Sequence, residues 1–214
     1  MARNFHLPKI YPITDRKVSG LSHEEQLFKL IEGGAQVVQI RDKTASSRAI
    51  FDSVKASLKI ARENEVKLIV NDRVDIALIL KADGVHLGQT DLPPRQARKI
   101  LGEDAIIGLS THRLEQAIAA VTQPVDYIAY GPVFETRSKA DHERVVGLEE
   151  LARVRERIGD FPLVAIGGID LENLEHVFAA GARSAAMISA IIGNGEICNN
   201  LLRATEKADT SRLR

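Results

Sequence analysis

Residues 37–71 read VVQIRDKTASSRAIFDSVKASLKIARENEVKLIVN and hold a complete strand–helix–strand pattern. A short run rich in β-branched residues covers Val37–Arg41, and a second run covers Leu68–Asn71. Between them, Ser46–Asn64 has the longer apolar period of an amphipathic helix. A helical crossover of this length joins neighbouring parallel strands, so the stretch predicts a βαβ unit.

The same alternation continues outward to both ends of the chain. It gives eight strand–helix units, each beginning with its strand, which predicts a parallel sheet covered by helices. We therefore expect an α/β fold, a single (β/α)8 TIM barrel of 214 residues. A doubly wound open sheet is the alternative, because periodicity does not show whether a sheet closes. The other strands are expected at Ile10–Thr14, Gly84–Leu87, Ile106–Leu109, Tyr127–Gly131, Leu163–Ile166 and Ala185–Ser189, and further helices at Glu24–Glu32, Arg113–Val121, Leu148–Ile158 and Leu171–Ala180.

Composition and charge favour one folded domain over residues 1–214. Hydrophobic residues make up 44% of the chain, enough for a sizeable core. Lys plus Arg equals Asp plus Glu at 29 each, so we expect no nucleic-acid and no membrane partner. We expect a frayed polar tail at 208–214, and one long connection, 132–146, that is either a lid or surface decoration.

The same sequence favours the cytoplasm. Its first residues lack the apolar run of a signal peptide, and no stretch is long and apolar enough to span a bilayer. Cys198, the single cysteine, has no partner for an internal disulfide and is expected to be buried in a helix.

Polar residues are concentrated at the strand ends, where active sites of such barrels form. Gln39, Arg41 and Lys43 alternate along one face, an amide followed by two cations. This set suits an anionic ligand with a polar ring, and a solvated strand end is the alternative. At another strand end, Ser110 either donates a hydrogen bond to a ligand or caps the next helix.

Two carboxylates, Asp72 and Asp91, follow adjacent strands. Together they could hold Mg²⁺, which takes few protein oxygens and completes its shell with water and substrate phosphates. Capping of the following helix is the alternative for Asp72. Farther along, Gly167–Gly168 follow the seventh strand and Ser189 ends the eighth, and the loops after these two strands often bind phosphate in this barrel. The histidines lack zinc-ligand spacing, and His86 is expected to be a hydrogen-bonded core residue rather than a base.

Read in order, these segments resemble the thiamine phosphate synthase family, and the likeness covers nearly the whole chain. One such motif would be weak support, but the ordered set is specific. The matching segments are Tyr11–Asp15, Gln39–Lys43, Asn71–Arg73, His86–Pro93, Gly108–His112, Gly131–Lys139, Ile166–Ile169 and Ile188–Ala190.

The resemblance implies roles for individual residues and a requirement for Mg²⁺. An aminopyrimidine diphosphate and a thiazole phosphate would be joined by a dissociative substitution, with Asp72 and Asp91 as the magnesium ligands. Catalysis would be mainly electrostatic, through Arg41, Lys43, Lys139 and Ser110. The implied pyrimidine diphosphate contacts are Gln39, Arg41, Lys43, Asn71, Ser110 and Lys139, and the implied thiazole phosphate contacts are Thr136, Ser138, Gly168, Ile188 and Ser189.

The chain departs from the family pattern at two positions. Family members commonly have Pro where Glu135 stands and Thr where Ser138 stands, so a carboxylate lies beside the expected phosphate loop. A related family of thiazole tautomerases tends to carry histidine where Pro132 stands and needs no magnesium carboxylates. A non-catalytic binder of thiamine precursors is a further alternative, although binding alone needs fewer charged groups. The oligomeric state, including a homo-oligomer, stays open.

Overall fold

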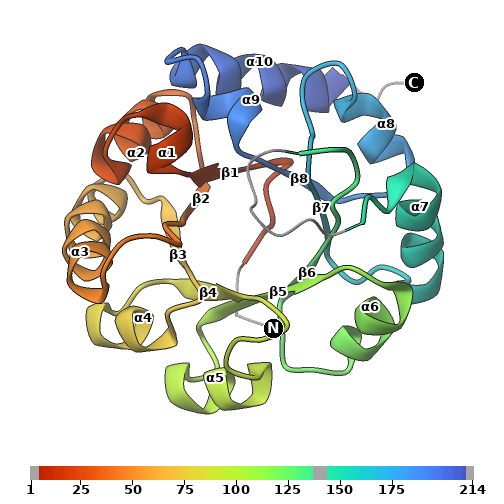
Figure 1. Cartoon of the computed structure of the whole chain (residues 1–214), viewed down its shortest axis with the longest axis horizontal. Helices are drawn as coiled ribbons and strands as arrows, with labels where there is room; N and C mark the ends of the chain where they lie inside the picture. Colours follow the sequence, from red (N-terminus) through yellow and green to blue (C-terminus); the bar gives the residue numbers. More distant parts are fainter. Residues whose placement is uncertain (1–4, 137–143, 211–214) are drawn as a thin grey trace.

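The computed structural model describes residues 5–136 and 144–210, and its strands form a closed parallel barrel (Figure 1). Hydrogen bonding follows chain order around the barrel, and the last strand pairs with the first through Ala185 and Ile10. Closure confirms the predicted TIM barrel and excludes the open sheet. The strands are β1 (Ile10–Thr14), β2 (Val37–Ile40), β3 (Lys67–Asn71), β4 (Gly84–Leu87), β5 (Ile106–Thr111), β6 (Tyr127–Tyr130), β7 (Leu163–Ile166) and β8 (Ser184–Met187).

Helices surround the barrel (Figure 1), and side chains next to them fix where several begin. Ser22 and Glu25 form a capping box at the start of one helix, and Ser46 caps another by accepting from the Ala49 amide. The described helices are α1 (Arg16–Ser19), α2 (His23–Glu32), α3 (Ser47–Glu63), α4 (Val74–Leu80), α5 (Pro94–Leu101), α6 (Leu114–Val121), α7 (Gly147–Ile158), α8 (Leu174–Ala179), α9 (Ser189–Ile192) and α10 (Ile197–Thr210). Across the described ranges, none of them combines the length and the apolar character needed to cross a membrane.

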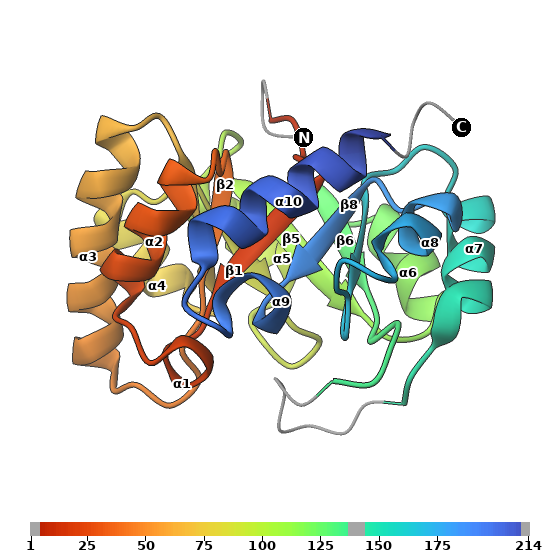
Figure 2. The same cartoon turned by 90° about the horizontal axis from the view of Figure 1, so that it is seen from above.

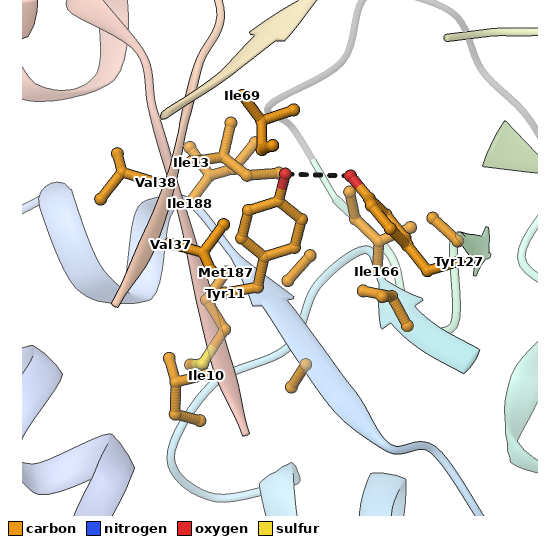
Figure 3. Close-up of a cluster of buried hydrophobic side chains, with 14 of the residues drawn as sticks. Ile10, Tyr11, Ile13, Val37, Val38, Ile69, Tyr127, Ile166, Met187 and Ile188 are labelled. Atoms are coloured by element: carbon orange, nitrogen blue, oxygen red, sulfur yellow. Dashed lines mark hydrogen bonds between the residues drawn. The ribbon is translucent and has the colours of Figure 1, made fainter. Parts of the chain in front are cut away.

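The barrel interior is a packed core. All strands except the ends of β3 are buried along their whole length, as expected for parallel strands enclosed by helices. Inside, the hydroxyl groups of Tyr11 and Tyr127 face each other at 3.0 Å (Figure 3). Gly108 makes room for this pair, because a Cβ atom there would lie 2.1 Å from the Tyr127 ring. The interior therefore holds polar groups among its apolar side chains.

Several predicted boundaries were wrong by a few residues. β2 ends at Ile40 and β6 at Tyr130, while β5 continues to Thr111. Ser189 was expected to end the last strand but begins α9, which contacts α1 at the same end of the barrel (Figure 2). These errors fall where strands pass into site loops, since hydrogen bonding across the sheet, which a single sequence does not show, sets the strand end.

The carboxyl-terminal tail also differs from expectation over its first residues. Ala208–Thr210 form the last turn of α10, and Ala208 is fully buried, so burial keeps this part helical. Residues 211–214 lie outside the described part. Cys198 is only partly buried. Of the 132–146 connection, both ends are described, and the Val146 amide donates to the Pro132 carbonyl at 2.8 Å.

Candidate active site

A cavity of about 690 Å³ opens at the carboxyl ends of the strands. Residues from each of the strands β1 to β8 line this cavity, so residues far apart in sequence meet there. The parallel register produces this convergence, because it brings every strand end to one face. Of the residues predicted for the pyrimidine diphosphate and for magnesium, the cavity is lined by Gln39, Arg41, Lys43, Asn71, Asp72 and Ser110, and Ile188 of the thiazole set also lines it.

Arg41 is held by a carboxylate that the sequence did not single out. Its Nη1 donates to Oδ2 of Asp15 at 2.9 Å, and both side chains are largely buried. Asp15 follows β1 and also caps α1 by accepting from the amides of Lys17 and Val18. The signals in the sequence were its position directly after a strand and its place in the matching segment Tyr11–Asp15. Asp15 thus fixes the guanidinium at the cavity wall.

The acidic part of the site is built around Asp72, near enough to Asp91 for that carboxyl group to affect its pKa. Lys43 Nζ approaches Oδ2 of Asp72 at 3.3 Å, and Oδ2 of Asp91 accepts from the Gly88 amide at 2.6 Å. Burial raises the pKa of Asp72 and the Asp91 carboxyl raises it further, while Lys43 lowers it. Lys43 therefore offsets part of the repulsion between the two carboxyl groups, and a bound cation would offset more of it.

The two capping alternatives do not describe the structure. Arg73, not Asp72, holds the N-cap position of α4, and Asp72 adopts a left-handed φ of 61°. Ser110 lies inside β5, and its hydroxyl meets Nε2 of His86 at 2.8 Å. His86 is buried and hydrogen-bonded as predicted, but it also lines the cavity. Asp72, Ser110 and His86 therefore all line the cavity.

A second, smaller hollow of about 30 Å³ adjoins the cavity and shares Ile166, Ala186 and Ile188 with it. Among the residues predicted for the thiazole phosphate, it is lined by Thr136, Gly168, Ile188 and Ser189. Ser138 lies outside the described residues, as does Lys139.

The paired glycines after β7 hold the neighbouring connection in place. Gly168 has a φ of 62°, and a Cβ there would lie 2.4 Å from the carbonyl oxygen of Glu135. The Gly167 carbonyl accepts from the Phe134 amide at 3.0 Å. The pair is therefore needed for close backbone approach, and the carbonyl of Glu135, rather than its side chain, sets the spacing.

Among the described residues, the site offers few oxygen atoms that could bind a metal ion. No group of three or more His, Cys, Asp or Glu side chains is placed there to hold a metal. A carboxylate pair without sulfur or imidazole suits a hard ion such as Mg²⁺, whose other positions are filled by water and phosphate. The donor set fits magnesium and disfavours zinc.

Comparison with known proteins gives the family. The sequence matches the profile described as "Thiamine monophosphate synthase" over residues 10–191. The chain belongs to this family. It is 43% identical over 190 residues to thiamine-phosphate synthase of Clostridium novyi (strain NT), a match that covers 88% of this chain and 93% of the relative. It is 45% identical over 189 residues to that of Syntrophomonas wolfei subsp. wolfei, covering 88% and 90%.

Solved structures agree with this assignment. Thiamine phosphate pyrophosphorylase from Pyrococcus furiosus superposes with a TM-score of 0.86 at 35% identity, covering 95% of this chain and 96% of that one. A structure titled "Native KDPGal structure" reaches a TM-score of 0.75 at only 14% identity, so that likeness concerns the fold alone.

Proposed function

We propose that this transferase joins an aminopyrimidine bearing a diphosphooxymethyl group to a thiazole bearing a phosphooxyethyl group. The products are thiamine phosphate and diphosphate. Membership of the family supports the reaction, and one feature of the site carries it: a cavity lined by Arg41, Lys43 and Asp72 adjoins a glycine-lined hollow. Two phosphorylated reactants must be held side by side to react. The same proposal makes both substrates small molecules and the cytoplasm the site of action.

The residues divide between the two substrates. Gln39, Asn71 and Ser110 are polar and uncharged, which suits the pyrimidine ring. Arg41 and Lys43 suit its diphosphate, and Lys139, outside the described residues, joins them. The thiazole phosphate is assigned to residues of the smaller hollow and its continuation: Thr136, Ser138, Gly168, Ile188 and Ser189.

Asp72 and Asp91 are the proposed magnesium ligands. Bound there, Mg²⁺ would add positive charge beside the diphosphate oxygens. The raised pKa of Asp72, caused first by burial and next by the neighbouring Asp91 carboxyl group, supports this assignment. Lys43, at 3.3 Å from Asp72, links the acidic pair to the cationic part of the same wall.

The chemistry requires one bond to break and one to form. The methylene carbon–oxygen bond of the pyrimidine breaks, and diphosphate leaves with the electron pair. The ring-stabilised cation is then captured by the thiazole nitrogen, whose lone pair forms the new carbon–nitrogen bond. No proton transfer and no side-chain nucleophile are needed. Arg41, fixed by Asp15, stabilises the charge that grows on the leaving group.

The test measures diphosphate release with both substrates, with each alone, and after chelation of divalent metal. Release should need both substrates and Mg²⁺, and thiamine phosphate should form in equal amount. Diphosphate release that is indifferent to the thiazole would contradict the proposal. Interconversion of thiazole isomers without any diphosphate release would favour the tautomerase instead.

A further inference from the structure

A line of five side chains crosses the barrel interior and joins two of the proposed ring contacts. Gln39 Nε2 donates to the Tyr11 hydroxyl at 3.1 Å, and that hydroxyl lies 3.0 Å from the hydroxyl of Tyr127 (Figure 3). Tyr127 continues to Nδ1 of His86 at 3.0 Å, and Nε2 of His86 reaches Ser110 at 2.8 Å. The side chains come from five strands, so only barrel closure assembles them.

The direction in which Gln39 donates sets the proton order along this line, since the other three contacts join groups that can act either way. Burial raises the pKa of Tyr11 to about 12 and that of Tyr127 well above its usual range, so each keeps a single O–H. Tyr11 already accepts from Gln39, so its own proton goes to Tyr127. The Tyr127 proton then goes to Nδ1 of His86, and a neutral imidazole in this arrangement carries its proton on Nε2 and donates it to Ser110.

The opposite order is unfavourable. It would direct two donors at the Tyr11 oxygen and leave the Tyr11 O–H to find another acceptor at a position that is 1% exposed. The order starting at Gln39 gives each phenol one donor and one acceptor. It leaves the Gln39 Oε1 atom as an acceptor and the Ser110 O–H as a donor, and both residues line the cavity.

We infer that Tyr11, Tyr127 and His86 are positioning residues that set this polarity and thereby select an amino-substituted pyrimidine. The inference rests on the proposed function. An aminopyrimidine presents an N–H donor on its amino group and an acceptor at the adjacent ring nitrogen, which complements Gln39 and Ser110. The oxo analogue presents a carbonyl acceptor and a ring N–H, so donor faces donor and acceptor faces acceptor. A site built around such hydrogen bonds rejects the mismatched ligand by up to about 10⁴-fold.

Tyr127→Phe is the decisive variant, because it removes one hydroxyl from the middle of the line and keeps the ring. The ring stacks on His86 at 5.5 Å and meets Tyr11 edge-on at 5.8 Å. Tyr130→Phe is the matched control, since Tyr130 lies on the same strand and is equally buried but is not part of the line. Binding of the aminopyrimidine diphosphate and of its oxo analogue is measured for both variants, and KM for each substrate is measured beside kcat.

We expect Tyr127→Phe to weaken aminopyrimidine binding about tenfold and to reduce discrimination against the oxo analogue by at least as much. KM for the thiazole should change little, and Tyr130→Phe should match the unmodified protein. The melting temperature of Tyr127→Phe should fall by a few degrees, because the buried Tyr11 O–H loses its acceptor. The ¹⁵N chemical shifts of His86 should show an Nε2–H imidazole in the unmodified protein and a mixture of tautomers in Tyr127→Phe.

Equal discrimination in both variants would overturn the inference, and so would an Nδ1–H tautomer of His86 in the unmodified protein. The histidine spectrum needs no turnover. If the protein releases no diphosphate but His86 shows the expected tautomer, the proposed function is wrong while the inferred polarity of the line stands. Loss of activity with both KM values rising together would indicate a merely structural role and would also overturn it.

Discussion

At the residue scale, the carboxylate pair gives the most direct test of the metal assignment. Asp91→Asn keeps an oxygen to accept from the Gly88 amide but removes the charge. We expect diphosphate release to fall at least about 100-fold, because a ligand charge that offsets Mg²⁺ is lost. Turnover is measured over a magnesium titration, with circular dichroism to follow the fold. Asp52→Asn, which affects an exposed ion pair with Arg48, should retain full activity, and near-normal turnover by Asp91→Asn would refute the assignment.

A second residue couples stability to pH. His23 is buried against Thr14, with 2.7 Å from Nδ1 to the hydroxyl oxygen, and burial lowers its pKa despite nearby Asp42. The unfolded chain therefore takes up this proton first as pH falls below about 6.5. Its contribution to stability is complete above that value and is lost as pH falls toward the lower folded pKa.

The free energy of unfolding should therefore drop between pH 7 and pH 5, with His23 contributing a slope of at most about 1.4 kcal/mol per pH unit. His23→Gln should flatten the curve in urea titrations across this range. His176→Gln, at an exposed site, is the control and should leave the slope as it is. An unchanged slope in His23→Gln would contradict the assignment.

At the element scale, the turn after β7 and the segment 132–136 form one unit. Gly168→Ala should push this segment outward, because the new Cβ meets the Glu135 carbonyl at 2.4 Å and the φ of 62° disfavours a side chain. We expect KM for the thiazole phosphate to rise about tenfold or more, and KM for the pyrimidine diphosphate to rise less. Steady-state kinetics with each substrate varied in turn provide the measurement.

Gly34→Ala is the control for Gly168→Ala, because it introduces the backbone strain without the steric clash. Gly34 has a φ of 82°, yet a Cβ there would meet nothing within 4 Å. It should lower stability slightly and leave both KM values unchanged. If Gly168→Ala behaves in the same way, the contact between the turn and the segment does not shape the thiazole site.

At the scale of the whole molecule, the two ends of the barrel have different tasks. At the end opposite the cavity, Arg98 of α5 donates to Asp126 at 2.8 Å and to the carbonyls of Ala105 and Pro124. Asp126 also accepts from the Ile107 amide, and both charged side chains are almost fully buried. These contacts hold α5 against the amino ends of β5 and β6, so they serve the stability of the fold rather than catalysis.

Arg98→Leu should therefore cost stability and not catalysis. It leaves the Asp126 carboxylate buried without its cation, which typically costs about 3–5 kcal/mol. Urea unfolding gives the free energy, and kcat under folding conditions should stay near that of the unmodified protein. Arg95→Leu on the exposed side of the same helix is the control. A stable Arg98→Leu protein with low kcat would contradict this division of tasks.

Much of the architecture could be read from local patterns. The strand and helix periods predicted the barrel, and placement at the strand ends predicted that Gln39, Arg41, Asp72 and Ser110 would share one cavity. Errors arose where a partner distant in sequence decides the outcome. Asp15 was given no role because its partner Arg41 lies on another strand. The last strand was predicted to reach Ser189, whereas α9 begins at that residue, at the mouth of the barrel.

The sequence by itself determined the alternation of strands and helices, the family, and the types of side chain at the strand ends, because each of these is a local property of the chain. Only the tertiary structure decided that the sheet closes, that the Asp91 carboxyl group lies near enough to affect the pKa of Asp72, and that Tyr11, Tyr127 and His86 join Gln39 to Ser110. Hydrogen bonds between strands act across the barrel, and their partners are fixed by register and closure, which no local period encodes.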